Sequence, residues 1–380
     1  SSIKPLTVYS PALEEGKMPF MVLNDAPVSY KTADGVWEPK NYDLKYRGMI
    51  TMRTAVQYSV NTFAIQMEDL VGIRHGFDMG KSLGLGLVDS PGTNDLNLAA
   101  LALGGLTKGV TPVQMAAAYS AFGNTGLYNQ PHFITKIVDS NGVIIYEFKP
   151  NSKRVMSQQT SWLMNNMLQT VVSAGTGTNA QVPNVPTAGK TGTSEELTDA
   201  WFCGVTPLYS GAVWMGYDEQ KYKMTNVAGG GAPALMFKAM MTKIYQGSKS
   251  GNWTMPANIV QVSVCTLSGK LASPFCPTEL VKNEFSLQSY VPNATCDIHL
   301  RAAVDSNLLP GTDFTGANNT GANITVKICT DARHNGVPYL ANVASPSQSG
   351  GCPARSVREM VLRPGEHLAV CTLKDHQIVR

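Results

Sequence analysis

Three short segments follow one another between residues 187 and 218: TAGKTGTS (187–194), AWFCGVTPL (200–208) and GAVWMGYD (211–218). Each segment is rich in Gly, Thr and aromatic residues, and turn residues separate them, which is typical of strands. Connections this short join neighbouring strands that run antiparallel. The sequence therefore predicts three consecutive strands of one antiparallel sheet.

Helical patterns lie on both sides of these strands. Residues 1–15 have a sparse apolar face that ends at Gly16, and residues 49–72 are helical around YSVNTF. A cap residue followed by proline, Thr111-Pro112, predicts a third helix start. Two further helices are predicted at 160–175 and 232–247. The expected fold class is α/β of the α+β type, with helices on both faces of an antiparallel sheet and a small β-rich C-terminal extension.

Composition excludes several functional classes. The chain has 380 residues, 43% of them hydrophobic, which is enough to bury a full core. A net charge of +3 is too small to favour a nucleic-acid partner. No run reaches the roughly 18 apolar residues that a membrane span requires. We therefore expect a soluble chain, or a piece whose targeting segment and membrane anchor lie upstream.

The chain opens with SSIKP, in which a serine and a lysine are three positions apart. On a helix, this spacing puts Ser1 and Lys4 on one face. An unprotonated lysine there can accept the serine proton, and burial among other cations would lower its pKa. The alternative interpretation is an ordinary helix cap followed by a surface lysine.

Two more motifs combine groups that suit a binding cleft. Ser59-Val60-Asn61 offers a hydroxyl for proton relay and an amide for a substrate amide, although a helix cap also explains it. KTGTS, residues 190–194, combines a cation, hydroxyls and a glycine on a predicted strand. The glycine lets a substrate backbone lie close, and the cation and hydroxyls suit a carboxylate. The alternative for KTGTS is a β-turn.

Taken together in this order, the motifs resemble the signature set of penicillin-binding proteins and class A β-lactamases. The chain up to about residue 247 resembles the transpeptidase domain of class A (bifunctional) penicillin-binding proteins. Three further segments look like recurring segments of that family: LNLAALALGGLTKGVTPVQMAAAYSAFGNTG (96–126), GTGTNA (175–180) and DAWFCGVTP (199–207).

The resemblance implies a role for each motif residue. Ser1 would be the nucleophile, although Ser2 is a rival, and the N–H groups of Ser1 and Thr193 would form the oxyanion hole. The other implied catalytic residues are Lys4, Ser59, Asn61 and Lys190, and the implied substrate-binding residues are Thr191, Gly192, Thr193 and Ser194. No cofactor and no metal are expected at this site.

The implied function is a D,D-transpeptidase that cross-links peptidoglycan stem peptides through a serine acyl-enzyme. Its partners would be stem peptides, lipid-linked precursors and cell-wall, divisome or elongasome proteins, with β-lactams as inhibitors, at the extracytoplasmic face of the bacterial membrane. Because strands and a glycosyltransferase domain precede this serine in the family, we expect a fragment that is poorly stable or inactive alone. The alternatives are an N-terminal-nucleophile hydrolase that uses Ser1, or a non-catalytic β-lactam sensor or wall-binding protein.

Residues 248–380 form a separate, cysteine-containing tail after a first domain at 1–247. The tail contains two copies of one small β module, at about 258–300 and 323–377. Each copy has three cysteines followed by a histidine, namely Cys265, Cys276, Cys296 and His299, then Cys329, Cys352, Cys371 and His376. Disulfides are the favoured interpretation, since cysteines cluster in this way in extracytoplasmic proteins, and zinc is the alternative.

Overall fold

The computed structural model describes residues 2–32, 35–194, 196–219, 221–299, 324–329, 339–340, 349–350, 357–362 and 378–379. The chain divides into two compact units. The first unit comprises residues 1–261 and 285–291, and the second comprises residues 262–284 and 292–380. The nucleophile predicted from the sequence, Ser1, lies outside the described residues.

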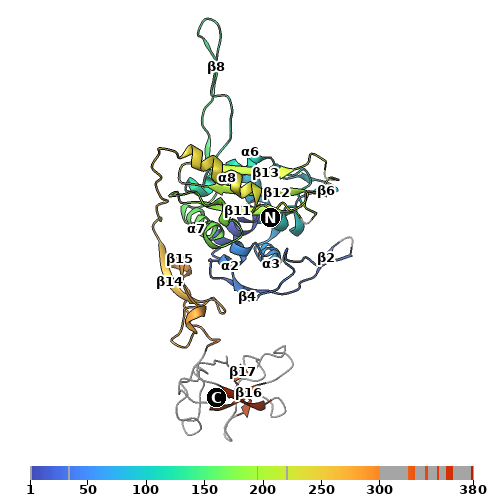
Figure 1. Ribbon diagram of the computed structural model, residues 1–380, viewed down its shortest axis with the longest axis vertical. Helices are drawn as coiled ribbons and strands as arrows, with labels where there is room; N and C mark the ends of the chain where they lie inside the picture. The colour runs from blue at the N-terminus through green and yellow to red at the C-terminus, as the bar shows by residue number, and fades with distance from the viewer. Residues whose placement is uncertain are drawn as a thin grey trace. The chain divides into compact units, whose positions relative to one another are not determined.

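The three predicted strands form one sheet in the first unit (Figure 1). They are β11 (Ala188–Thr193), β12 (Asp199–Val205) and β13 (Ser210–Gly216), and each neighbouring pair is antiparallel. The register pairs Lys190 with Cys203. The predicted antiparallel arrangement is confirmed.

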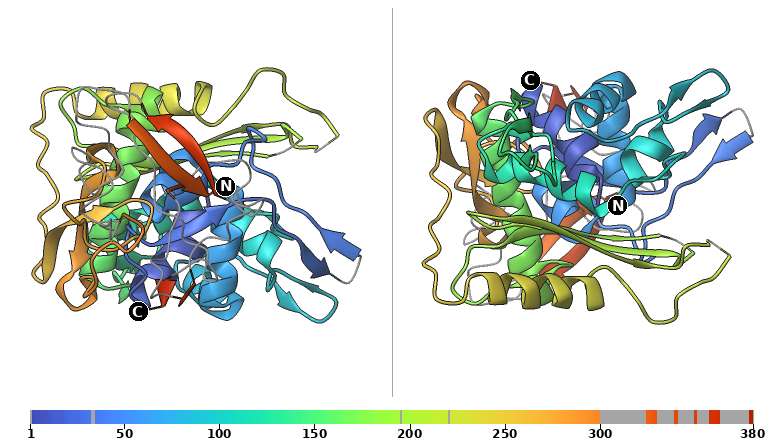
Figure 2. Two further views of the ribbon diagram at one scale, coloured as in Figure 1. Left: turned by 90° about the horizontal axis from the view of Figure 1, so that it is seen from below. Right: turned by 90° about the horizontal axis from the view of Figure 1, so that it is seen from above.

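Helices cover both faces of this sheet (Figure 2). On one face, Phe202 packs against Phe237 of α8 (Ala232–Ile244), with ring centroids 5.0 Å apart. On the other face, α6 (Pro112–Gly123) packs against β12 and β13. Side chains alternate between the two faces along each strand, so both can be apolar. The core on the α8 side consists of Val172, Ala180, Val182, Phe202, Val213, Ala234, Phe237 and Met241.

Helix starts follow the predicted capping signals. Thr111 caps α6 by accepting from the Gln114 N–H, and the Gln114 side chain accepts from the Thr111 N–H in return. Ser157 caps α7 (Gln158–Ala174) by accepting from the Thr160 N–H. The other helices of the first unit are α2 (Met52–Tyr58), α3 (Asn61–Val71), α4 (Ile73–Ser82), α5 (Leu98–Leu103), η2 (Thr178–Ala180) and η4 (Gln288–Tyr290).

The first helix departs from the expected α-helix. It begins as a π-helical turn, η1 (Pro5–Tyr9), and continues as α1 (Ser10–Glu14). Pro11 has no N–H to donate within a regular helix, and the turn before it is widened. Both the N–H and the hydroxyl of Ser10 bond to the Pro5 carbonyl. The helix ends before Gly16, whose φ of 80° suits a glycine stop.

Short strand pairs complete the first unit. Strand β1 (Val22–Asp25) pairs with β4 (Gly48–Thr51), and the other pairs are hairpins or short ladders. These are β2 (Tyr30–Thr32) with β3 (Gly35–Trp37), β5 (Asp89–Ser90) with β6 (Thr93–Asn94), β7 (Leu127–Asn129) with β10 (Ser152–Arg154), and β8 (Lys136–Val138) with β9 (Ile144–Glu147). No helix among the described residues has the length and apolar character needed to cross a bilayer.

Strand β14 (Ile259–Cys265) pairs with β15 (Val281–Leu287), and η3 (Thr278–Leu280) precedes β15. The remaining strands belong to the second unit and are β16 (Ile324–Cys329), β17 (Tyr339–Leu340), β18 (Ser349–Gly350), β19 (Val357–Leu362) and β20 (Ile378–Val379). Strand β16 lies between β17 and β19. Most of the second predicted module, including Cys352, Cys371 and His376, lies outside the described residues.

Candidate active site

Lys4 is the best-defined member of the predicted site. It lies just before η1, and its side chain is fully buried. Its Nζ donates to Asn61 Oδ1 at 2.6 Å and to the main-chain oxygen of Ser59 at 2.9 Å. The structure therefore brings together residues that are more than fifty positions apart in the sequence. A surface lysine after a helix cap, the alternative interpretation, is wrong.

The turn between α2 and α3 positions both acceptors of the Lys4 hydrogen bonds. Ser59 ends α2 in the left-handed conformation, with φ 57° and ψ 38°, and Asn61 begins α3 two residues later. This turn directs the Ser59 carbonyl and the Asn61 amide towards the same ammonium group. The sequence predicted a role for the Ser59 hydroxyl, whereas the bond to Lys4 uses its main-chain oxygen.

Lys190, on β11, is also fully buried, and its Nζ donates to the Thr191 carbonyl at 3.0 Å. Burial lowers the pKa of Lys190 to about 7, and burial followed by the charge of Lys190 lowers the pKa of Lys4 well below its usual value. Removing an ammonium group from water disfavours its charged form, and a second cation nearby adds to this effect. Both effects favour the neutral form of Lys4, which is the form in which an amine can accept a proton.

Strand β11 lies directly beside the start of the chain. A Cβ placed on Gly192 would be 3.0 Å from Ser2 Oγ and 3.1 Å from Ser2 N. Tyr119 of α6 holds the same segment, because its hydroxyl donates to the Ser2 carbonyl at 2.6 Å. Glycine at 192 thus leaves room for Ser2, whereas the motif predicted the close approach of a substrate backbone, and nothing in the sequence indicated Tyr119.

The hydroxyl groups of the KTGTS motif all have partners in the protein. The Thr191 hydroxyl bonds to that of Thr176 at 2.7 Å. The Thr193 oxygen accepts from the Gly229 N–H at 3.1 Å, which leaves its own proton available for donation. The Ser194 oxygen accepts from the N–H groups of Thr198, in the loop that joins β11 to β12, and of Asp199, the first residue of β12. Ser194 therefore shapes this loop.

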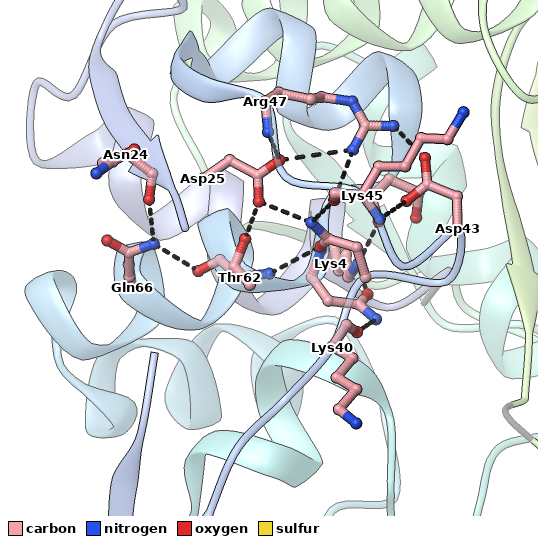
Figure 3. Close-up of polar contacts among 12 residues, drawn as sticks. Lys4, Asn24, Asp25, Lys40, Asp43, Lys45, Arg47, Thr62 and Gln66 are labelled. Carbon is pink, nitrogen blue, oxygen red and sulfur yellow. Dashed lines mark hydrogen bonds and ion pairs between the residues drawn. The ribbon is translucent and has the colours of Figure 1, made fainter. Parts of the chain in front are cut away.

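A polar network centred on Asp25 joins the start of α3, through Thr62, to Arg47 (Figure 3). The Asn61 N–H donates to Asn41 Oδ1 at 2.8 Å, and Asn41 Nδ2 donates to Asp25 Oδ1 at 2.7 Å. Asp25 is completely buried, and it also accepts from the Thr62 hydroxyl and the Arg47 N–H. Both Asp25 and Asn41 are buried although they lie in a segment without apolar periodicity, where polar residues are usually exposed.

Comparison with known protein families identifies the family of this chain. Residues 1–242 match the family model described as the penicillin binding protein transpeptidase domain. The chain belongs to the penicillin-binding protein transpeptidase family. Residues 255–301 match a second model, the C-terminal domain of penicillin-binding protein 1A. The predicted resemblance to penicillin-binding proteins is thereby confirmed.

Curated relatives of this penicillin-binding protein include proteins from Bacillus subtilis and from Clostridium species. It is 40% identical over 270 residues to penicillin-binding protein 1F of Bacillus subtilis (strain 168), which covers 69% of this chain and 36% of that protein. It is 35% identical over 315 residues to penicillin-binding protein 1A of Clostridium tetani, which covers 79% of this chain and 40% of that protein. The chain thus spans less than half the length of these relatives.

Solved structures confirm the predicted fold class. Penicillin-binding protein 1A from Haemophilus influenzae is 25% identical with a TM-score of 0.66, over 78% of this chain and 48% of that one. Penicillin-binding protein PonA1 from Mycobacterium tuberculosis is 22% identical with a TM-score of 0.58, over 67% of this chain and 69% of that one. The second likeness concerns the fold alone.

Proposed function

We propose that this domain is a peptidoglycan D,D-transpeptidase that acts through an acyl-enzyme on Ser1. The observation that carries the proposal is the buried Lys4, which bonds to Asn61 and Ser59 and whose pKa is lowered by burial and by Lys190. A neutral amine placed one helical turn after the serine can accept the hydroxyl proton.

The proposed reaction has two acyl-transfer steps. The Ser1 oxygen attacks the carbonyl between the two terminal D-alanines of a stem peptide while Lys4 takes the hydroxyl proton. The amide bond breaks, and the terminal D-alanine leaves with a proton on its nitrogen. An amine from a neighbouring stem then attacks the ester, forms the cross-link and releases the serine. Each tetrahedral oxyanion needs N–H donors, and we assign these to Ser1 and Thr193.

The β11 strand supplies the substrate-facing groups in this proposal. Lys190 provides a cation for the terminal carboxylate, and Thr193 retains a hydroxyl proton to donate. Thr191 and Gly192 belong to the same strand, and Gly192 allows Ser2 to lie close to it. β-Lactams present the same carboxylate and a strained amide, so they acylate Ser1 and block the enzyme.

We place the full-length protein at the extracytoplasmic face of the bacterial cell membrane, where stem peptides and lipid-linked precursors are found. Its relatives among class A enzymes support a second activity in the full-length protein, namely peptidoglycan glycosyltransferase. Cell-wall, divisome or elongasome proteins are its proposed partners. The tail of this chain has no assigned part in the acyl transfer.

The decisive experiment is labelling of the full-length protein with fluorescent penicillin, followed by peptide mapping of the adduct. Ser1→Ala should abolish the covalent label, whereas Ser2→Ala should keep the adduct on Ser1. A label that persists in Ser1→Ala, or an adduct that maps to Ser2, would refute the assignment of the nucleophile.

The same protein separates the rival functions. An N-terminal-nucleophile hydrolase requires Ser1 to be the first residue, so acylation in a chain that continues upstream of Ser1 excludes it. A β-lactam sensor would be labelled but would not join two stem peptides. Cross-linked product formed by the wild type and absent from Ser1→Ala supports the transpeptidase.

A further inference from the structure

Four metal-ligating side chains of the second unit converge on one point. The ligand atoms of Cys265, Cys276, Cys296 and His299 all lie within 4.8 Å of one another. Cys265 and Cys296 are buried, His299 is 9% exposed, and Cys276 is half-buried. All three cysteines are free thiols, so the disulfides favoured from the sequence are wrong for this copy of the module.

The spacing of these atoms matches the edges of a tetrahedral zinc site. His299 Nδ1 lies 3.5 Å from Cys265 Sγ and 3.4 Å from Cys296 Sγ. Zinc–sulfur bonds near 2.3 Å and zinc–nitrogen bonds near 2.0 Å give a sulfur-to-nitrogen edge of about 3.5 Å in a tetrahedron. The observed distances leave room for an ion at the centre without rearrangement of these three groups.

Main-chain pairing holds the ligands in place from separate segments. Leu271 bridges to Val264, just before Cys265, and to Thr295, just before Cys296. Ser273 supports the other two ligands. Its N–H donates to Cys276 Sγ at 3.3 Å, and its hydroxyl donates to the His299 carbonyl at 3.2 Å. Such outer hydrogen bonds orient metal ligands and favour thiolate sulfur.

The module around the ligands has almost no other core. Among the described residues 262–284 and 292–299, the buried hydrophobic side chains are Val264, Cys265 and Cys296. Two of these three are members of the ligand group itself. A module this small needs a disulfide or a metal to compensate for its missing core, and the free thiols exclude the disulfide.

We infer that the first tail module binds one Zn²⁺ through Cys265, Cys276, Cys296 and His299, as a structural centre separate from the acyl-transfer site. Three thiolates and one imidazole fill all four tetrahedral positions, which leaves no open position for a substrate. Binding replaces three thiol protons with one divalent ion, so three protons leave and the centre carries a net charge of −1. Soft thiolate ligands in a tetrahedral arrangement favour zinc over magnesium or calcium.

The test is metal content of the full-length protein, purified with a reductant, stripped with a chelator and reloaded with zinc sulfate as the only added metal. Zinc per chain is measured by mass spectrometry after gel filtration. Because the second copy carries the same residue types, the readout is the difference from wild type. Cys276→Ser and His299→Ala should each contain one zinc fewer per chain. Equal zinc in wild type and both variants would overturn the inference.

Two further variants distinguish the loss of a zinc ligand from a general disruption of the module. Asp297→Asn alters a residue between two ligands whose carboxylate is paired with Lys270, and it should keep the full zinc content. His299→Cys restores a fourth ligand and should also keep it, whereas a soluble His299→Cys protein with one zinc fewer would contradict the ligand assignment. A disulfide between any two of Cys265, Cys276 and Cys296 in the zinc-loaded wild type would likewise refute it.

Discussion

Replacing Asn41 with Ala tests whether the buried polar network positions Asn61, one of the proposed catalytic residues. The Asn41 side chain donates to Asp25 and accepts from the main-chain N–H groups of Asn61 and Thr62. Alanine removes these bonds and leaves two N–H groups without their acceptor at the start of α3. It also removes one donor from the completely buried Asp25 carboxylate.

The expected magnitude follows from counting the groups left without partners. A buried donor or acceptor without a partner costs about 1 to 3 kcal/mol, so the two N–H groups should lower the free energy of unfolding by about 2 to 6 kcal/mol. The Asn61 amide also loses the bond that fixes its main chain. A shift on the order of 1 Å in a catalytic group reduces rates by up to about a hundredfold, so acylation should slow by roughly ten- to a hundredfold.

The assay follows both effects in the full-length protein. Fluorescent penicillin gives the second-order acylation rate constant, and the fraction of chains still labelled after equilibration in urea reports the stability of this domain alone. Asn24→Ala is the matched control, because this exposed residue precedes Asp25 and takes part through its main-chain oxygen. The control should stay within about 0.5 kcal/mol of wild type. If Asn41→Ala behaves like Asn24→Ala, the network does not position Asn61.

Other substitutions test the remaining physical claims. Lys4→Met should slow acylation by about 10² to 10⁴, the usual contribution of a general base, as measured by penicillin labelling. The wild-type acylation rate should fall at acid pH, because Lys4 gains a proton there. Binding of carboxylate-bearing penicillins should weaken above about pH 7, because Lys190 then loses its proton and its positive charge. Gly192→Ala should slow acylation about tenfold with little loss of stability, because its Cβ would press on Ser2 at 3.0 Å. Glu68→Gln should raise the free energy of unfolding by about 3 kcal/mol at pH 7, as measured in urea.

The sign of the Glu68 effect follows from its surroundings. Burial raises the pKa of this carboxyl to about 9, so the folded protein keeps a proton that the unfolded chain loses near its ordinary pKa of 4.5. Stability should therefore fall as pH rises between these values, and Glu68→Gln should remove that dependence. Asp69→Asn, at the exposed neighbouring position, should retain it. A wild-type stability that does not change across this range would contradict a buried, protonated Glu68.

Local signals carried the fold prediction and most of the site prediction. Thr111-Pro112 predicted the start of α6 because capping depends on residues within one turn. The strands at 188–216 were predicted because their turns and residue types are local properties too. The wider turn of η1 depends on Pro11, which has no N–H to donate to the carbonyl four residues earlier.

The residues that contact the candidate site residues could not be predicted from local signals. Asn41 and Asp25 lie in a segment without apolar periodicity, and their burial depends on contacts with α3. A polar residue in such a segment is usually exposed, so sequence reasoning places it on the surface. Tyr119 was likewise interpreted only as part of a helix, because its bond to the Ser2 carbonyl joins positions that are distant in the sequence.

The tail shows why residue types alone did not decide between two chemistries. Cysteines in an extracytoplasmic protein favour disulfides, but three cysteines leave one without a partner and give the histidine no role. The C-x-x-H spacing of Cys296 and His299 is the local signal that favours a metal, since it puts two ligands on one turn. The structure adds Cys265 and Cys276 at distances that suit a shared ion. Zinc accounts for all four side chains at once, whereas a disulfide accounts for two.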